Sequence, residues 1–181
     1  MNSSQAQIEV KSVSKSYGGV VANKDISIRV PHGRITGLIG PNGSGKTTLF
    51  NSIVGYHPID SGSITFEGQE ISTLRVPDIA RLGMLRTFQQ TRIYKKMNCV
   101  QNMIISVSHR DEGFGGIFKQ AKDRETEQQA EELLNFVGLY QKRNLISGDL
   151  SFGQQKLLEF AMALMNKPKV LLLDEPTAGI N

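Results

Sequence analysis

The chain contains no tryptophan, one cysteine and no long run of apolar residues. The lone thiol, Cys99, excludes an internal disulfide and a cysteine-based zinc cluster, as is typical of a protein in a reducing compartment. No apolar stretch is long enough to span a bilayer, and the first residues lack the cationic flank and apolar core of a secretion signal. We therefore expect a cytoplasmic protein in which Cys99 is a small buried residue of a helix.

Strong charge of one sign is also missing. The 21 Lys+Arg residues nearly balance 17 Asp+Glu, which gives a net charge of +4, and the basic residues are scattered in pairs such as Lys95-Lys96. This pattern argues against nucleic acid as a partner and favours an ordinary solvated surface. The alternative is that a few basic residues lie near acidic lipid headgroups.

Segments typical of β-strands open the chain. Between residues 8 and 30 the runs IEVKSV and ISIRV alternate apolar and polar residues, which predicts antiparallel strands covered on one face. Residues 35–40 predict a strand, and residues 46–54 predict a helix that ends at Gly55. Further short strands are expected at 63–68, 84–88 and 170–174, with a short helix at 77–82.

The second half of the chain is mostly helical in character. One face of a strongly charged segment carries the apolar residues Ala130, Leu133, Leu134 and Val137. A length of 181 residues suits one α/β domain. We therefore expect residues 1–181 to form a single domain with a helical subdomain at approximately 90–165.

Residues 40–47, GPNGSGKT, match the phosphate-binding loop pattern in full and lie between a predicted strand and a predicted helix. The glycines let backbone N–H groups point at phosphate oxygens, and the helix adds its positive N-terminal end. Lys46 is expected to reach the β and γ phosphates, and the Thr47 hydroxyl to ligate Mg²⁺. The alternative, a glycine turn that happens to precede a helix, leaves the adjacent lysine and hydroxyl unexplained. GTPases, kinases and motor proteins share the motif, so it predicts nucleotide binding and no particular family.

The segment LSFGQQ begins at Leu150. Ser151 is placed to cap a helix running from Gln154, and Gly153 allows backbone N–H groups to approach an anion closely. The alternative is an ordinary capped helix whose core face is formed by Leu157, Ala161, Leu164 and Met165.

The apolar run VLLLD predicts a central strand buried on both faces. It delivers Asp174 and Glu175 at its carboxyl end, where ligands gather in open α/β sheets. The alternative is a polar turn after a strand.

With these motifs the sequence resembles the ABC ATPases, since LSFGQQ is similar to their signature sequence and LLLDEP to their Walker B motif running into the catalytic glutamate. The resemblance implies a P-loop NTPase core with a mainly parallel sheet, an antiparallel β subdomain and a helical subdomain. It also implies a dimer, because in the family the signature surface of one subunit contacts the γ phosphate held by the other.

The resemblance assigns roles to single residues. Asp174 is expected to hold Mg²⁺ through its water shell, Glu175 to polarise the attacking water, and Gln89 to touch both. Tyr17 occupies the place of the aromatic residue that stacks on adenine. By themselves, Tyr17 is more typical of a packing residue and Gln89 of a solvated side chain. The expected ATP contacts are Tyr17, Gly40, Pro41, Asn42, Gly43, Ser44, Gly45, Lys46, Thr47, Thr48, Ser151, Gly153 and Gln154, the metal ligands Thr47, Gln89 and Asp174, and the catalytic residues Glu175 and Gln89.

Several stretches, among them RTFQQTRIYKKMNCVQN and LLLDEPTAGIN, look like the LivG-type ATPases of branched-chain amino acid importers. This implies a second ATPase subunit and transmembrane permease subunits as partners, with a substrate-binding protein further away. It also implies a peripheral location on the cytoplasmic face of the cell membrane.

The sequence departs from the family pattern in three places. Phe152 replaces a glycine of the common signature, and Met162 stands where many relatives have arginine. The family's switch histidine, which normally lies well downstream of the catalytic glutamate, has no counterpart, since all three histidines precede Glu175. We therefore expect a C-terminally truncated domain, for which a nucleotide-binding module without turnover is one alternative. A soluble non-transport ABC-type ATPase is another, but the long coiled-coil insertion or tandem cassettes usual there are absent.

Overall fold

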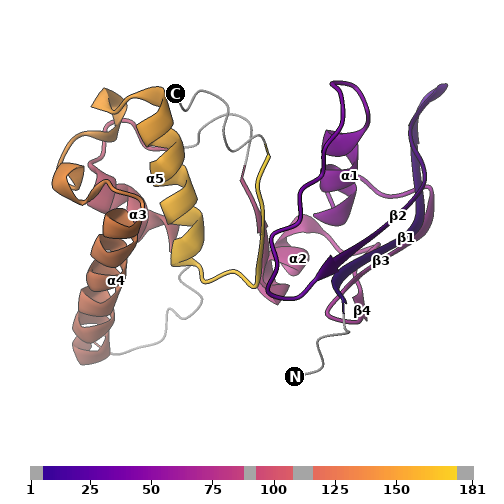
Figure 1. Ribbon diagram of the computed structural model, residues 1–181. Helices are drawn as coiled ribbons and strands as arrows, with labels where there is room; N and C mark the ends of the chain where they lie inside the picture. The colour runs from indigo at the N-terminus through magenta and orange to yellow at the C-terminus, as the bar shows by residue number, and fades with distance from the viewer. Residues whose placement is uncertain (1–5, 88–92, 108–115, 175–181) are drawn as a thin grey trace. The chain divides into compact units, whose positions relative to one another are not determined.

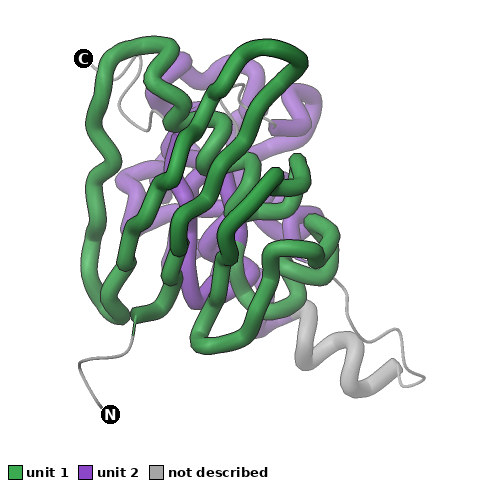
Figure 2. Tube along the Cα trace, turned by 90° about the vertical axis from the view of Figure 1, so that its right-hand side faces the viewer, with its two compact units in different colours: residues 1–84 green, residues 85–181 purple. Residues whose placement is uncertain are grey.

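The computed structural model describes residues 6–87, 93–107 and 116–174. The chain divides into two compact units, residues 1–84 and 85–181 (Figure 2). Each unit is described by itself below. No helix in the described ranges is both long and apolar enough to cross a membrane.

A four-stranded sheet forms the centre of the first unit, with the strand order β2-β1-β3-β4 (Figure 1). Each neighbouring pair is antiparallel, which confirms the strands predicted from alternation. Ile8, Val10 and Val13 of β1 are buried together with Ile64 and Phe66 of β3. The bounds are β1 (Ala6–Tyr17), β2 (Val20–Pro31), β3 (Ser61–Phe66) and β4 (Gln69–Glu70).

Helix α1 (Lys46–Ile53) ends where the sequence predicted. Gly55 has φ 75°, a left-handed conformation that favours glycine, and its N–H donates to the Ser52 carbonyl at 3.2 Å. A Cβ on Gly55 would lie 2.6 Å from the Leu74 carbonyl oxygen, so the close approach of the next segment also requires glycine.

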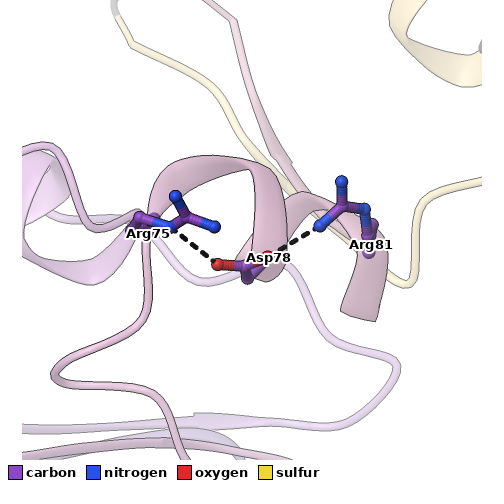
Figure 3. A network of polar contacts seen from close by, with 3 residues as sticks. All are labelled: Arg75, Asp78 and Arg81. Carbon is purple, nitrogen blue, oxygen red and sulfur yellow. Dashed lines mark hydrogen bonds and ion pairs between the residues drawn. The ribbon is translucent and has the colours of Figure 1, made fainter.

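Helix α2 (Val76–Leu82) confirms the short helix predicted at 77–82. It buries Ile79, while Asp78 in its first turn accepts from Arg75 Nε at 3.2 Å and from Arg81 Nη1 at 2.7 Å (Figure 3). The carboxylate suits the positive end of the helix. Because both arginines are well exposed, these ion pairs add little to stability.

The strand predicted at residues 35–40 is wrong for the described structure, in which residues 34–41 adopt no regular element. A β-strand exists only through hydrogen bonds to a neighbour, and none of the described strands pairs with this segment. Its apolar side chains are accordingly uncovered, with Ile35 and Ile39 103% and 94% exposed.

Strands β5 (Met84–Arg86) and β6 (Val170–Leu172) form a second, two-stranded sheet. The Thr87 N–H donates to the Leu172 carbonyl at 3.0 Å and extends the pairing by one residue. The prediction that VLLLD is buried on both faces is wrong for Val170, Leu171 and Leu173, which are partly exposed. β6 has β5 as its hydrogen-bonded neighbour within the described ranges, so part of its surface stays uncovered.

Three helices, α3, α4 and α5, make the core of the second unit. Cys99 is fully buried, which confirms the prediction, and burial raises the pKa of its thiol. Ala130 and Leu134 are also fully buried, with Leu133 and Val137 packed against the same core. The bounds are α3 (Cys99–Ser106), α4 (Gly116–Phe136), η1 (Tyr140–Lys142), η2 (Ser147–Asp149) and α5 (Phe152–Met165).

The core face of α5 differs from the predicted one. Ala161 and Met165 are buried as expected, and Leu157 is partly buried against the same core. Leu158 and Met162 are also buried, whereas Leu164 is only partly buried. Both choices fit helical spacing, and the neighbouring helices decide which of them faces inward.

A buried amide ties the loop before α3 to the helical core. Asn102 is fully buried, and its Oδ1 accepts from the Tyr94 N–H at 2.7 Å. Its Nδ2 lies within hydrogen-bond distance of the carbonyls of Tyr94, Met97 and Asn98 and of Ser147 Oγ. Ser147 Oγ donates back to the Tyr94 carbonyl at 3.0 Å.

Asn102→Ala is expected to lower the free energy of unfolding of the helical core by at least about 2 kcal/mol. The substitution leaves buried backbone groups without partners, each of which costs about 1–3 kcal/mol. Urea unfolding followed by circular dichroism measures the change. Gln128→Ala is the control, since it removes one exposed contact with Glu132 on the surface of α4. Equal midpoint shifts in the two variants would contradict this role for Asn102.

Candidate functional site

The phosphate loop folds back around the amine of Lys46. The Lys46 ammonium donates to the carbonyls of Gly40 and Pro41, both at 2.8 Å, and the Ser44 N–H donates to the Pro41 carbonyl at 3.3 Å. These bonds close residues 40–46 into a ring that includes the Lys46 ammonium. A ring of this kind can accept an anion between the lysine and the backbone N–H groups.

Helix α1 begins directly at this loop, with Gly45 as its N-cap. No side-chain hydrogen bond caps the helix within the described structure. The N–H groups of its first turn have no partners inside the helix, so they are available to an anion. Thr47, one of the residues predicted to bind the metal, is exposed in the same turn.

Strand β2 approaches the loop so closely that Gly45 can carry no side chain. A Cβ there would lie 2.3 Å from the Ala22 carbonyl oxygen and 2.5 Å from Asn23 Nδ2. Gly45 also has φ 86°, in the left-handed region. The Asn23 amide donates to the Gly45 carbonyl at 3.2 Å and holds the loop against the strand.

Tyr17 ends β1 in the same unit as the phosphate loop and is 42% exposed. Its ring makes an edge contact with His57, with centroids 5.6 Å apart. Lys15, two residues earlier, pairs across the sheet with Asn23, which contacts the loop. One continuous set of contacts therefore joins Tyr17 to Gly45.

In the second unit, Ser151 caps α5 as predicted. Ser151 Oγ accepts from the Gln154 N–H at 3.3 Å, and Gln154 Oε1 accepts from the Ser151 N–H at 3.1 Å, which together make a capping box. The capping box orders the first turn of α5. Gly153, which carries no side chain, lies in that turn. The Phe152 ring is about half exposed beside it, with Lys156 Nζ 5.5 Å from the ring centroid.

Asp174 lies two residues after β6 in a nearly buried ion pair. Arg86 Nη2 donates to Asp174 Oδ2 at 2.7 Å, and the two side chains are 8% and 10% exposed. A buried carboxylate requires such a partner, because an unpaired charge is costly away from water. The arginine therefore fixes the orientation of the predicted metal ligand.

The predicted residues fall into separate groups. Tyr17 and residues 40–48 belong to the first unit, and Ser151, Gly153, Gln154 and Asp174 belong to the second. Gln89 and Glu175 lie outside the described residues.

Sequence reasoning missed Asn23 and Arg86. Arg86 could have been found from one signal, since it follows two apolar residues in a predicted strand, where a cation needs a partner. Nothing in the sequence marked Asn23.

Hydroxyl and carboxylate oxygens are donor types that suit Mg²⁺. The first unit offers the hydroxyl of Thr47, and the second unit offers the carboxylate of Asp174. Clusters of three or more His, Cys, Asp or Glu side chains are absent from the described residues.

A scan against family models decides the family. Residues 23–178 match the model described as ABC transporter, a range that includes the phosphate loop, the α5 segment and both carboxylates. The chain belongs to the ABC transporter family. As the resemblance implied, it is an ATP-binding cassette of an ABC transporter.

Relatives in the ABC transporter family support the assignment. The chain is 38% identical over 180 residues to the "High-affinity branched-chain amino acid transport ATP-binding protein BraF" of Pseudomonas aeruginosa, covering 96% of this chain and 71% of that protein. It is 32% identical over 184 residues to LivG of Escherichia coli, with 98% and 72% covered.

Solved cassettes share the fold. The ADP conformation of MJ1267, "an ATP-binding cassette of an ABC transporter", matches with a TM-score of 0.82 at 32% identity over 98% of this chain and 72% of that one. CbiO1 from Clostridium perfringens matches with a TM-score of 0.82 at 27% identity, with 97% and 68% covered. The predicted fold class is therefore confirmed.

Gly45→Ala is expected to destabilise this ABC cassette more than Gly43→Ala, by at least about 1 kcal/mol. Both glycines have left-handed φ values, but a Cβ on Gly43 meets nothing within 4 Å, whereas one on Gly45 overlaps β2. The matched pair separates overlap from backbone strain. Thermal unfolding of the two variants measures the difference, and equal midpoints would refute the tight contact.

Proposed function

We propose that this ABC cassette binds and hydrolyses ATP in a dimer and thereby powers import of branched-chain amino acids through permease subunits. The observation that carries the proposal is the closed phosphate loop, in which Lys46 bonds to the Gly40 and Pro41 carbonyls directly before the uncapped start of α1. The names of the matched relatives support the substrate class.

Binding rests on residues 40–48 and Tyr17. The backbone N–H groups of the loop and of the first turn of α1 hold the phosphates, and Lys46 exchanges its two carbonyl partners for β and γ oxygens. Tyr17 offers part of its ring to the adenine as a stacking surface. The loop thus binds any triphosphate, and the ring favours one that carries a base.

Turnover rests on Asp174, Glu175 and Gln89. Mg²⁺, when bound, neutralises charge on the phosphates, and Thr47, Asp174 and Gln89 are the residues proposed to hold it. Arg86 keeps the Asp174 carboxylate in one orientation. Glu175 is proposed to accept a proton from the attacking water, and Gln89 to contact that water.

Two kinds of partner complete the proposed cycle. Ser151, Gly153 and Gln154, ordered by the capping box, face the γ phosphate of a second ATPase subunit in the proposed dimer. Permease subunits receive substrate from a substrate-binding protein. At the cytoplasmic face of the membrane they are proposed to respond to the movement that ATP hydrolysis produces in the dimer.

Lys46→Ala is expected to weaken ATP binding at least about tenfold, or about 1.4 kcal/mol, because it removes the cation that faces the β and γ phosphates. Isothermal calorimetry measures the affinity. Lys24→Ala, an exposed lysine of β2, is the matched control. An unchanged ATP affinity in Lys46→Ala would contradict the assignment of residues 40–48 to phosphate binding.

Glu175→Gln is expected to keep ATP binding and to lower phosphate release about a hundredfold in the chain assembled with its partners, as loss of a general base requires. Steady-state phosphate release is the measurement, and Glu127→Gln on the exposed surface of α4 is the control. Undiminished release would move the catalytic role elsewhere. A parent assembly that binds ATP without releasing phosphate would favour a binding module instead.

A further inference from the structure

The strongest unassigned cluster in the first unit surrounds Tyr17. We propose that His57 is a positioning residue for the nucleobase, which acts with Lys15 and Asp60 to hold the Tyr17 ring as a fixed stacking surface. The inference rests on the proposed binding of ATP at the phosphate loop. It identifies the residues that position the adenine in that site.

His57 meets the Tyr17 ring from the segment that follows α1. The ring centroids lie 5.6 Å apart at an interplanar angle of 84°, the edge-to-face arrangement that aromatic pairs favour. Pro58 follows His57 and restricts the backbone before it to extended conformations. The imidazole is therefore presented to Tyr17 by a segment with little freedom to turn it away.

Lys15 contacts the same ring, and Asp60 holds Lys15. The Lys15 ammonium lies 5.4 Å from the Tyr17 centroid, within the range of a cation–π contact. It also donates to Asp60 Oδ1 at 2.9 Å, while Asp60 Oδ2 accepts from the Ser16 N–H at 2.6 Å. Asp60 therefore binds both the lysine and the backbone N–H next to Tyr17. The hydrogen bond from Lys15 and, to a smaller extent, the one from Ser16 lower the pKa of the Asp60 carboxyl.

The same residues fix the ring relative to the phosphate loop. Lys15 is the cross-strand partner of Asn23, whose amide donates to the Gly45 carbonyl at 3.2 Å. Tyr17 is still 42% exposed, which leaves surface for contact with a purine. The cluster therefore orients a free aromatic surface without taking part in phosphate binding.

This division of roles predicts selectivity between two ligands. His57→Ala frees the Tyr17 ring to rotate and should weaken ATP binding about threefold to tenfold, the range that one aromatic pair supplies. Inorganic tripolyphosphate carries the phosphates without a base, so its affinity should stay unchanged. A merely structural role for His57 would weaken binding of both ligands together.

The experiment measures both ligands by calorimetry in His57→Ala, Tyr17→Ala and the double variant. His57→Ala should add no further loss in the Tyr17→Ala background, because His57 acts through that ring. His57→Phe should restore ATP affinity, since it keeps an aromatic partner. His32→Ala, an exposed histidine of the same unit, is the matched control, and thermal unfolding verifies that each variant is folded.

Asp60→Asn provides a second route if His57→Ala does not fold. It removes the charge that holds Lys15, so the same selective loss of ATP affinity is expected. ATP affinity unchanged in both variants, or equal losses for ATP and tripolyphosphate, would overturn the inference alone. A parent chain that binds neither ligand would overturn the proposed function and this inference with it.

Discussion

Strand β2 and the phosphate loop approach each other at Gly45 more closely than any side chain would permit, with the Ala22 carbonyl 2.3 Å from where a Cβ would stand. This contact brings Asn23 within reach of the loop and places the start of α1 against the antiparallel sheet. Tyr17 and its neighbours belong to the same sheet. The glycine therefore sets the spacing between the phosphate side and the base side of the proposed ATP site.

The second unit positions its chemistry by satisfying buried polar groups. Asn102 and Ser147 bind the backbone at Tyr94 and hold the segment before α3. Arg86 and Asp174 neutralise each other at the ends of β5 and β6. In both places a polar group away from water must be paired, and its partner determines where the neighbouring backbone lies.

Local patterns in the sequence predicted local structure well. Alternation predicted the antiparallel strands, Gly55 the end of α1, and Ser151 with Gln154 the capped start of α5. Features that depend on distant residues were missed or wrong. The apolar side chains of residues 35–40 predicted a strand. A strand forms only by hydrogen bonding to a neighbouring strand, and the sequence of the segment does not show whether one is present. The partners of Asn23 and Arg86 lie 22 and 88 positions away in the sequence, so no local sequence pattern predicts these contacts.

The single thiol has a practical consequence for how this cassette can be studied. Cys99 is sealed inside the packing of α3, α4 and α5, and its burial keeps the thiolate population low. A thiol-reactive dye can therefore label it only when the helical core opens. Since the sequence holds no other cysteine, the labelling rate follows the opening of that core alone. The chain thus carries its own site-specific reporter of local unfolding in the second unit, separate from events at the phosphate loop.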